Sequence, residues 1–350
     1  MTAKVSVIMS VYNGERFLRE AVDSILGQTF SNFEFIIVDD GSCDGSRRIL
    51  ESYTDRRIIL AANGVNLGLA RSLNKAFDLA RGAYLARMDA DDVATRHRLE
   101  KQVTFLNGHA ETGLLGTSYR FIDGRGRDRG GGCVTTGDLL IRWKILLENP
   151  FAHPTVMLRR AVLIQNALRY DDTFETAQDY ELWTRVLRHT GGANLAEPLM
   201  KLRTHEDSVS NQRWQTQFEN GQVVALRTIG ENLPDFPVTP ERVGQIQQFF
   251  LGGRKPPPGS GVRRTALAGL YLDLFAAFAS RYAGPPSLRV LRREAVASAV
   301  CGLLRPPLEA GSTDVLRRLL AMDRRLPWYI FDHLARAVGR RLGPGFLGLW

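Results

Sequence analysis

The stretch YLARMDADDV, residues 84–93, places three aspartates directly behind an apolar run. Asp89, Asp91 and Asp92 fall within four consecutive positions, where their like charges repel and oppose folding unless a cation lies among them. Residues 84–88 have the composition of a buried strand. The stretch therefore predicts a buried strand that delivers a cluster of carboxylates to one edge of a sheet.

The segments before this stretch repeat the order of strand and helix. Residues 4–11 and 33–38 are β-rich and nearly continuously apolar, and residues 17–26 carry apolar side chains at helical spacing. This alternation predicts an α/β fold, a mostly parallel sheet sandwiched by helices. Ligands bind beyond the carboxyl ends of the strands in such sheets, and Asp39 and Asp40 share that edge with the cluster.

The later part of the chain is less regular. Residues 112–123 are predicted to form a strand pair, residues 124–132 a loop, and residues 177–189 an amphipathic helix. We expect a first domain over residues 1–215 and a basic, helical C-terminal region over residues 216–350.

The composition, 44% hydrophobic and 24% charged, is that of an ordinary soluble protein of 350 residues. Its net charge of +9 comes from the tail, because residues 251–350 hold 16 Lys and Arg against 6 Asp and Glu. Cys43, Cys133 and Cys301 show no C-x-x-C spacing. They therefore indicate neither a zinc site nor a disulfide framework, and they favour a reducing compartment.

The three clustered aspartates suit a metal ion. Carboxylates are hard oxygen ligands, which Mg²⁺ and Mn²⁺ prefer and soft metals do not. One divalent cation would relieve the repulsion and leave coordination positions open for a diphosphate. A solvated acidic loop is the alternative, but the strand context and the second cluster at Asp39 and Asp40 favour the metal.

Three blocks of the sequence, residues 5–30, 33–46 and 66–92, resemble successive blocks of family 2 inverting glycosyltransferases of the GT-A fold. The similarity covers about residues 4–210, and the ordered set is more specific than any single block. The resemblance implies a GT-A catalytic domain that transfers a sugar from a nucleotide-diphosphate-sugar with inversion at the anomeric carbon.

In that family the ends of the first two strands hold the nucleotide. The resemblance implies that Ser10 and Tyr12 lie against the base and that Asp40 accepts a hydrogen bond from a uracil-like imide N–H. It places Arg71 near the base or phosphates and Asp89 near the ribose or sugar. A UDP-sugar is therefore the favoured donor.

The block DADD matches the family's D-x-D signature. By this likeness Asp91 and Asp92 would engage Mn²⁺ or Mg²⁺, with His205 as an added ligand. The ion would act as a Lewis acid on the departing nucleoside diphosphate. His153 matches a block that lines the acceptor side of the pocket, and a purely structural histidine is the alternative there.

Inversion requires a general base opposite the leaving group. The family supplies it from a Glu-Asp pair that opens a helix, and the matching carboxylate here is Asp179. Gln178 stands where the glutamate is usual, a departure that bears on the tuning of the base. Glu181 is the alternative base.

Processive members of the superfamily carry Q-x-x-R-W and several membrane spans. This chain has Ser210 ahead of Arg213 and Trp214. Its longest apolar tail segment, residues 265–279, contains Asp273 and falls short of the roughly 20 residues of a span. We therefore expect a cytoplasmic enzyme that adds one sugar to a glycan or lipid-linked acceptor, with cell-surface polysaccharide synthesis as the commonest role.

The basic tail mixes arginines with aromatic side chains, namely Trp328, Tyr329, Phe331 and Trp350. This mixture suits helices that lie on an anionic membrane surface, here the inner face of the cell membrane. A helical subdomain that packs on the catalytic domain or on a second subunit, as in a homodimer, is the alternative. Nucleic-acid binding is disfavoured because the basic helices also carry apolar stripes.

Two rival classes remain. A sugar nucleotidyltransferase would share the architecture, but it needs a glycine-rich loop with Arg and Lys after the first strand, and residues 10–17 offer one glycine. A non-catalytic relative that binds nucleotide sugar is supported by Gln178 and opposed by Asp179 together with the three clustered aspartates.

Overall fold

The computed structural model describes residues 4–132, 134–206, 213–247, 264–282, 284–303 and 312–322. The chain divides into two compact units, Met1–Ile145 with Asn149–Val224 and Leu146–Glu148 with Ala225–Trp350. All site residues predicted above belong to the first unit. The domain boundary at residue 215 stays a prediction.

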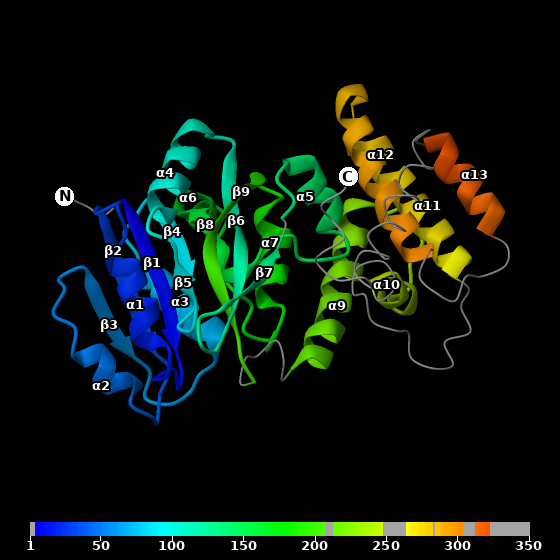
Figure 1. The fold of residues 1–350 in the computed structure, drawn as a ribbon. Helices are drawn as coiled ribbons and strands as arrows, with labels where there is room; N and C mark the ends of the chain where they lie inside the picture. The colour runs from blue at the N-terminus through cyan, green and yellow to red at the C-terminus, as the bar shows by residue number, and fades with distance from the viewer. Residues whose placement is uncertain are drawn as a thin grey trace, which may run out of the picture. The chain divides into compact units, whose positions relative to one another are not determined.

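A mixed sheet with strand order β3-β2-β1-β4-β8-β6-β9-β5 forms the first unit, and β7 pairs with β6 (Figure 1). Its strands are β1 Val5–Val11, β2 Phe33–Asp39, β3 Ile58–Ala62, β4 Tyr84–Met88, β5 Val93–Ala94, β6 Thr112–Asp123, β7 Asp128–Gly132, β8 Met157–Arg159 and β9 Gly191–Thr204. β1 pairs in parallel with β2 and β4, and β2 with β3. The aspartates that follow β2 and β4 therefore meet at one edge, and the predicted α/β fold is confirmed.

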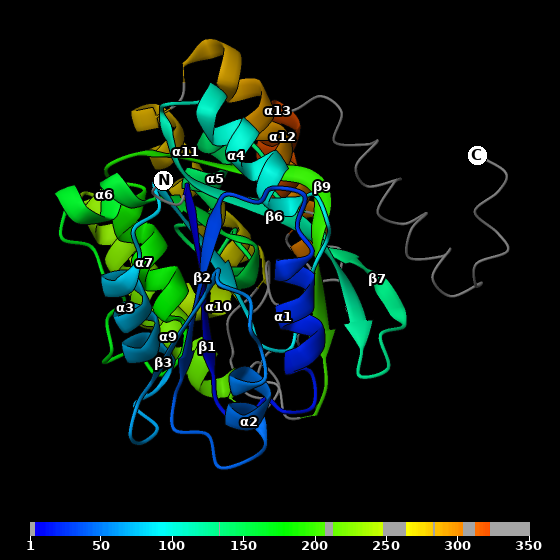
Figure 2. The ribbon, with the colours of Figure 1, turned by 90° about the vertical axis from the view of Figure 1, so that its left-hand side faces the viewer.

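Helices connect these strands and cover both faces of the sheet. They are α1 Leu18–Leu26, α2 Ser46–Glu51, α3 Leu69–Leu79, α4 Arg98–Gly108, α5 Asp138–Lys144, the 3₁₀ helix η1 His153–Thr155, α6 Arg160–Gln165 and α7 Gln178–Val186. In Figure 2, α1 and α3 lie on opposite sides of β1 and β2. Val7 and Ile8, neighbours in β1 that point to opposite faces, are 0% and 1% exposed. This explains why the strand is apolar at nearly every position.

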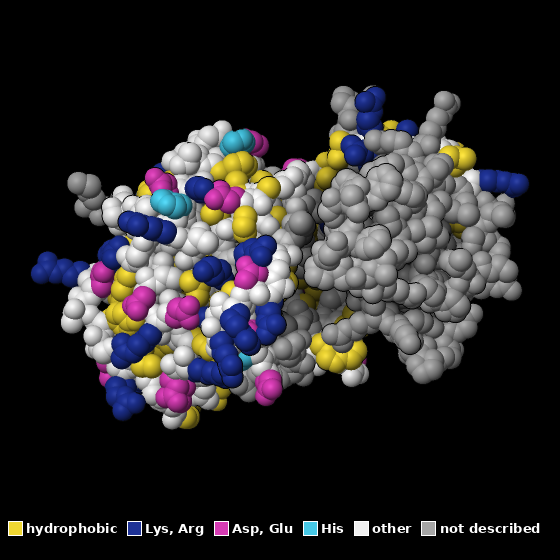
Figure 3. All heavy atoms as spheres, in the orientation of Figure 1, with side chains coloured by type: hydrophobic (Ala, Val, Ile, Leu, Met, Phe, Trp, Pro, Cys, Tyr) yellow, Lys and Arg dark blue, Asp and Glu magenta, His cyan; other side chains and the backbone are white. Residues whose placement is uncertain are grey.

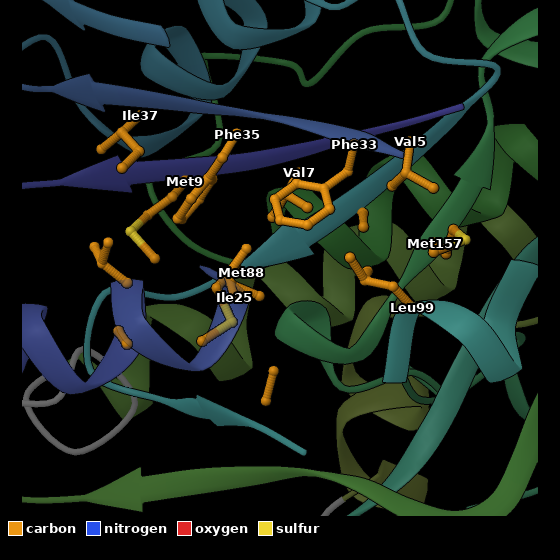
Figure 4. Packing of buried hydrophobic residues seen from close by; sticks show 14 of the residues in the cluster. Val5, Val7, Met9, Ile25, Phe33, Phe35, Ile37, Met88, Leu99 and Met157 are labelled. Carbon is orange, nitrogen blue, oxygen red and sulfur yellow. The ribbon is translucent and has the colours of Figure 1, made fainter. Parts of the chain in front are cut away.

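The core beneath α1 and α4 is built from every second residue of β1 and β2. Its members labelled in Figure 4 are Val5, Val7, Met9, Ile25, Phe33, Phe35, Ile37, Met88, Leu99 and Met157. Burying each such side chain contributes about 1.5–3 kcal/mol. The core therefore holds the two strands that lead into aspartates, β2 and β4, in a fixed register.

Two predictions for the later part are wrong. Residues 112–123 form one long strand, β6, rather than a strand pair, because β9 pairs with it in parallel along most of its length. The predicted loop at residues 124–132 contains β7. Its glycines have weak strand propensity, and the pairing comes from β6 and from the 2.7 Å ion pair between Arg120 and Asp128.

The turn that follows β2 requires glycine at position 41. Gly41 has φ +75°, and a Cβ there would lie 2.6 Å from the backbone carbonyl carbon of Val65. We expect Gly41→Ala to lower the free energy of unfolding by about 1–3 kcal/mol, measured by denaturant titration. Gly64→Ala is the matched control, since a Cβ there meets nothing within 4 Å. Equal stability of the two variants would contradict this close approach of the loops.

The first unit carries both signs of charge on its surface. Lysine and arginine side chains lie interspersed with aspartate and glutamate over the face shown in Figure 3. Exposed ion pairs such as Arg47–Glu51 at 2.8 Å contribute little to stability individually. Such interspersed charge is typical of a solvated surface rather than of a face that binds nucleic acid.

The second unit is helical. It contains the later part of α9 Trp214–Asn232, then α10 Pro240–Ile246, α11 Arg264–Tyr282, α12 Pro285–Leu303 and α13 Ser312–Met322. An ion pair of 2.6 Å between Arg318 and Asp273 joins α13 to α11. In the part of the chain that the structure describes, no helix has the length and apolarity to traverse a membrane.

Several residues discussed above lie outside the described residues, namely Cys133, Ser210, Trp328, Tyr329, Phe331 and Trp350. The membrane-surface contact and the homodimer suggested for the basic tail therefore stay predictions.

Candidate functional site

The three aspartates of the opening stretch come together at the end of β4. One carboxylate oxygen from each of Asp89, Asp91 and Asp92 can be chosen so that all lie within 4.8 Å of one another. β4 is buried throughout, and β5 directly after the cluster pairs with β9, so both ends of this short loop are fixed. The result is a compact set of hard oxygen ligands at the sheet edge.

β9 brings two further groups to the cluster. Nε2 of His205, directly after β9, lies 3.0 Å from Oδ2 of Asp91. Oδ1 of Asp92 accepts a hydrogen bond of 2.8 Å from the backbone N–H of Arg203. Burial and the nearby charge of Asp89 raise the pKa of Asp91. The structure thus places His205 beside the predicted ligands, where a cation would offset their charge.

Arg203 is a site residue that the sequence analysis missed. Its side chain is 2% exposed. Nε donates to the backbone carbonyl of Asp91 at 2.8 Å, and Nη2 donates to Glu20 at 2.5 Å. Its guanidinium lies 4.5 Å over the ring of Phe17. Arg203 therefore ties the acidic loop to β9 and to α1, and its position two residues before His205 was the available signal.

Arg87 was also missed. It lies within β4, is 1% exposed, and donates hydrogen bonds to the carboxylate of Asp89 and to the backbone carbonyl of Met88. Nη2 of Arg98, a fully buried residue of α4, donates to the backbone carbonyl of Arg87 at 2.7 Å. Burial and the nearby Arg87 lower the pKa of Arg98 to about 9. Arg87 and Arg98 thus add two buried guanidinium groups to that of Arg203 near the acidic cluster.

Asp40 follows β2 and is 2% exposed. Its Oδ1 accepts hydrogen bonds from Nδ2 of Asn63 at 2.7 Å and from the backbone N–H of Leu67 at 2.9 Å. Its Oδ2 accepts from the backbone N–H of Gly68 at 2.9 Å. Asp40 therefore shapes the loop before α3. The hydrogen bond that Asp40 would accept from a base N–H stays a prediction, and it would be a fourth hydrogen bond to this carboxylate.

The other residues predicted to bind nucleotide lie near the same edge of the sheet. Ser10 is half-buried at the end of β1, and Tyr12 beside it is 50% exposed, which leaves its ring accessible for stacking. Arg71 in α3 donates from Nε to Asp172 at 2.6 Å. A contact of Arg71 with base or phosphate would compete with this ion pair, and all three assignments stay predictions.

Asp179 lies in the first turn of α7, as expected. Ala177, the residue that precedes this helix, has φ +60°. The carboxylate is half-buried, and its Oδ2 accepts a hydrogen bond of 2.8 Å from Nδ2 of Asn149. Burial raises the pKa of Asp179 to about 6. A carboxylate with this pKa is mostly ionised at neutral pH, and it is a stronger base than an ordinary aspartate.

The neighbours of Asp179 on α7 differ from it in their contacts. Glu181, the alternative base, is 1% exposed and accepts two hydrogen bonds from Arg185, one of them 2.8 Å long from Nε. Gln178 is 7% exposed, and its Oε1 has no hydrogen-bond partner among the described residues. The contacts of Glu181 are those of a structural residue, which favours Asp179 as the candidate base.

His153 lies in η1 within an aromatic cluster. Its Nε2 is 2.7 Å from the hydroxyl of Tyr170, and its ring meets that of Trp183 edge-on at 6.0 Å between centroids. Burial, with a smaller effect of Arg87, lowers the pKa of His153 well below its usual value, so the ring is neutral. These contacts are those expected of a purely structural histidine, and the role of His153 on the acceptor side stays a prediction.

The model of a family described as "Glycosyl transferase family 2" matches residues 6–166. A Bacillus subtilis protein assigned as glycosyltransferase EpsE is 36% identical, over 67% of this chain and 85% of its own length. The chain belongs to glycosyl transferase family 2.

Other family 2 glycosyltransferases and a solved structure agree with this assignment. The O-antigen biosynthesis glycosyltransferase WbnJ of Escherichia coli is 33% identical over 58% of this chain and 81% of its own length. The structure of residues 1–349 of S. aureus TarS with UDP matches with a TM-score of 0.53 at 17% identity. It covers 94% of this chain and 88% of that one, which shows the GT-A fold. The resemblance stated from the sequence is thereby confirmed.

Proposed function

We propose that this glycosyltransferase moves a single sugar, with inversion at the anomeric carbon, from a UDP-sugar to a hydroxyl group of a glycan or lipid-linked acceptor. The observation that carries the proposal is the group of three carboxylates at the end of β4, with oxygens within 4.8 Å of one another. The choice of UDP is supported by the TarS structure with UDP, and the glycan acceptor by the O-antigen role in the name of WbnJ.

The donor set at this edge fits Mn²⁺ or Mg²⁺. Asp91 and Asp92 supply carboxylate oxygens, and His205 adds an imidazole nitrogen 3.0 Å from Asp91. Asp89, whose carboxylate lies beside theirs, is left to contact the ribose or sugar of the donor. A divalent ion held there would stabilise the negative charge that develops on the leaving nucleoside diphosphate. Arg203 fixes this loop through its bonds to Asp91 and Asp92.

Asp179 acts as the general base in this proposal. It takes the proton from the acceptor hydroxyl while that oxygen attacks the anomeric carbon and the bond from carbon to the diphosphate oxygen breaks. Asn149 holds the carboxylate in place through its 2.8 Å hydrogen bond. Because His153 is neutral, it can line the acceptor side without adding charge there.

Of the two rival functions, the sugar nucleotidyltransferase has no support from the family match. A non-catalytic nucleotide-sugar-binding relative rests on Gln178 alone, and the proposal of Asp179 as the base is supported against it by the raised pKa of that carboxylate. Turnover of a nucleotide sugar by the purified chain distinguishes the proposed transferase from the non-catalytic relative.

The experiment is release of nucleoside diphosphate from a panel of UDP-, GDP- and dTDP-sugars by the full chain, with Mn²⁺, with Mg²⁺ and with EDTA. Water serves as the acceptor in this assay. We expect one UDP-sugar to be hydrolysed at least about tenfold faster with a divalent ion than with EDTA. Binding of UDP in a thermal-shift assay without turnover of any sugar would instead identify the non-catalytic relative.

A further inference from the structure

A cavity lies at the edge of the sheet where β1 and β4 begin, away from the three aspartates. Its volume is about 570 Å³, and residues at the starts of β1 and β4 and at the junction of β8 with α6 line it. Figure 2 shows α6 at the end of the sheet where β1 begins. Tyr84 in this cavity is five residues from Asp89, or about 16 Å of extended chain. The cavity is therefore distinct from the donor site.

Four cationic side chains from the ends of three neighbouring strands line this basic cavity, namely Lys4, Arg81, Arg159 and Arg160. Backbone hydrogen bonds hold the three segments together. The N–H of Tyr84 donates to the carbonyl of Lys4 at 3.1 Å, and the N–H of Arg160 donates to the carbonyl of Ala83 at 2.9 Å. β8 runs antiparallel to β4, so its last residue lies beside the first residue of β4. The sheet pairing thus gathers the four charges.

The basic cavity has no acidic lining. Neither aspartate nor glutamate is among the described residues around it. Glu34 lies nearby, but its carboxylate accepts hydrogen bonds from the backbone N–H of Arg81 at 2.7 Å and from the hydroxyl of Ser6 at 2.5 Å. Within the described part of the chain, the side chains of Lys4, Arg81 and Arg160 form no ion pair. Their charges are therefore not offset by carboxylates of those segments.

This lack of ion pairs differs from the rest of the first unit. Exposed arginines elsewhere on its surface pair with carboxylates, as Arg47 does with Glu51 at 2.8 Å and Arg120 with Asp128 at 2.7 Å. Like charges that are gathered without a counter-charge repel one another. The argument made for the three aspartates therefore applies here with the opposite sign, and an anion would offset the repulsion.

Two of the four cations are held in place by one aromatic ring. The ammonium of Lys4 and the guanidinium of Arg159 lie 5.1 Å and 5.4 Å from the centroid of the Tyr84 ring, which is 2% exposed. Nη2 of Arg159 also donates to three backbone carbonyls at and beyond the end of α4. Arg159 is thus largely structural, whereas Arg81 and Arg160 keep their guanidinium donors for a ligand. Cations that are already ordered lose less entropy when a ligand binds.

The size and lining of the basic cavity indicate the chemistry of its ligand. Guanidinium groups match the oxygens of a phosphate group with paired N–H donors. A volume of about 570 Å³ falls within the range of about 300–1,000 Å³ that is usual for small-molecule sites, so it holds more than a phosphate ion. Ile164 of α6, which lines the cavity, is 59% exposed and offers an apolar contact.

We propose that the basic cavity is a second ligand site of this protein and binds a molecule that carries a phosphate group. Arg81 and Arg160 bind the phosphate oxygens, Lys4 adds positive charge, and Ile164 contacts the organic part. A soluble phosphorylated molecule and the headgroup of an anionic lipid both present this group. Binding at this site requires neither the sugar donor nor a metal ion.

The first test is calorimetric titration of the full chain with inorganic phosphate, in EDTA and without nucleotide. We expect saturable binding by the parent, and an affinity at least about tenfold lower in the double variant Arg81→Gln, Arg160→Gln, because charged hydrogen bonds are lost. The matched control is Arg47→Gln with Arg120→Gln, which removes two positive charges at exposed, ion-paired positions. Its affinity should equal that of the parent. Absence of saturable binding by the parent, or equal losses in both double variants, overturns the proposal.

The second test compares melting temperatures in phosphate and in chloride at equal ionic strength. Phosphate at about ten times its Kd should raise the melting temperature of the parent by about 2–4 °C over chloride. The control double variant should show the same rise, and the cavity double variant a smaller one. Rises of equal size in all three proteins would reflect a general effect of phosphate on folding and would overturn the site. If the cavity double variant does not fold, Arg81→Gln alone replaces it in both tests, since Arg81 is exposed.

Vesicles of phosphatidylglycerol, compared with vesicles of phosphatidylcholine, distinguish the two sources of the phosphate group once phosphate binding is established. Sedimentation with the anionic vesicles that the cavity double variant loses identifies a lipid headgroup as the ligand. Sedimentation that this variant keeps, or none by the parent, identifies a soluble ligand. None of these measurements uses a nucleotide sugar, so their outcome is independent of the proposed function.

Discussion

Asp179→Asn is expected to lower sugar transfer by about 10²–10⁴-fold while binding of the donor is retained. The amide keeps the shape of the side chain and can still accept the hydrogen bond from Asn149, but it cannot take a proton from the acceptor hydroxyl. The measurement is kcat for the donor found in the nucleotide-sugar panel, together with the Kd of UDP by calorimetry in the presence of Mn²⁺.

Glu175→Gln is the control for this variant. Glu175 precedes α7, and its side chain is 73% exposed. Removal of its charge should leave kcat at the parent value. The assignment of the base is wrong if Asp179→Asn retains more than a tenth of kcat, or if it loses donor binding to the same extent as transfer.

With Asp179 as the proposed base, its raised pKa should also set the pH dependence of sugar transfer. Because this pKa is about 6, kcat/KM should be level at neutral pH and fall by about tenfold per unit below the pKa. In the window between the unfolded value of about 3.9 and this folded value, the folded state binds more protons than the unfolded state. The group's contribution to stability is therefore full below this window and is lost as the pH rises through it.

Asp179→Asn removes that unfavourable ionisation. The variant should therefore melt no lower than the parent at neutral pH, even though its activity is lost. A marked fall in melting temperature would indicate that the ionised carboxylate stabilises the fold, and would contradict the environment described for Asp179.

Asp91→Asn is expected to weaken Mn²⁺ binding and to lower kcat/KM by about 10²–10³-fold, because the leaving diphosphate loses its counter-charge. The variant should fold normally, since it removes one of three mutually repelling carboxylates whose oxygens lie within 4.8 Å. Calorimetric titration with Mn²⁺, with and without UDP, measures the effect directly and does not depend on turnover.

Asp128→Asn is the matched control for Asp91. Asp128 lies on β7 of the same sheet, and its side chain is 53% exposed in an ion pair with Arg120. Its replacement should leave Mn²⁺ affinity unchanged. Parent-like Mn²⁺ affinity in Asp91→Asn, with activity also unchanged, would remove this aspartate from the metal site.

The sequence predicted the parallel half of the fold because its strands are buried on both faces. β1, β2 and β4 are apolar at nearly every position, which is the pattern of strands in a parallel sheet that helices cover on both faces. β7 could not be predicted in this way. Its residues DRGGG have little strand propensity of their own, and their pairing with β6 arises only in the folded chain.

At the site, the sequence indicated which acidic residues lie together, but it did not indicate the residues that hold them in place. Asp89, Asp91, Asp92 and His205 do come together. The residues that donate hydrogen bonds to the carboxylate of Asp40 are Asn63 and two later ones, and no local sequence pattern links positions that far apart. Arg203 and Arg87 were missed because an arginine within a strand is usually read as solvent-exposed. An arginine beside aspartates in a fully buried strand is the signal that would have identified Arg87.

The contribution of β9 to the acidic loop limits how this enzyme can exchange parts with its relatives. Residues 6–166, which match the family model, contain the three aspartates, whereas Arg203 and His205 come from beyond that boundary. A chimera that joins this first segment to the later segment of a relative would inherit the carboxylates without their supports, unless the incoming strand brings equivalent side chains. An exchange of segments between relatives should therefore keep β9 together with the loop of the three aspartates.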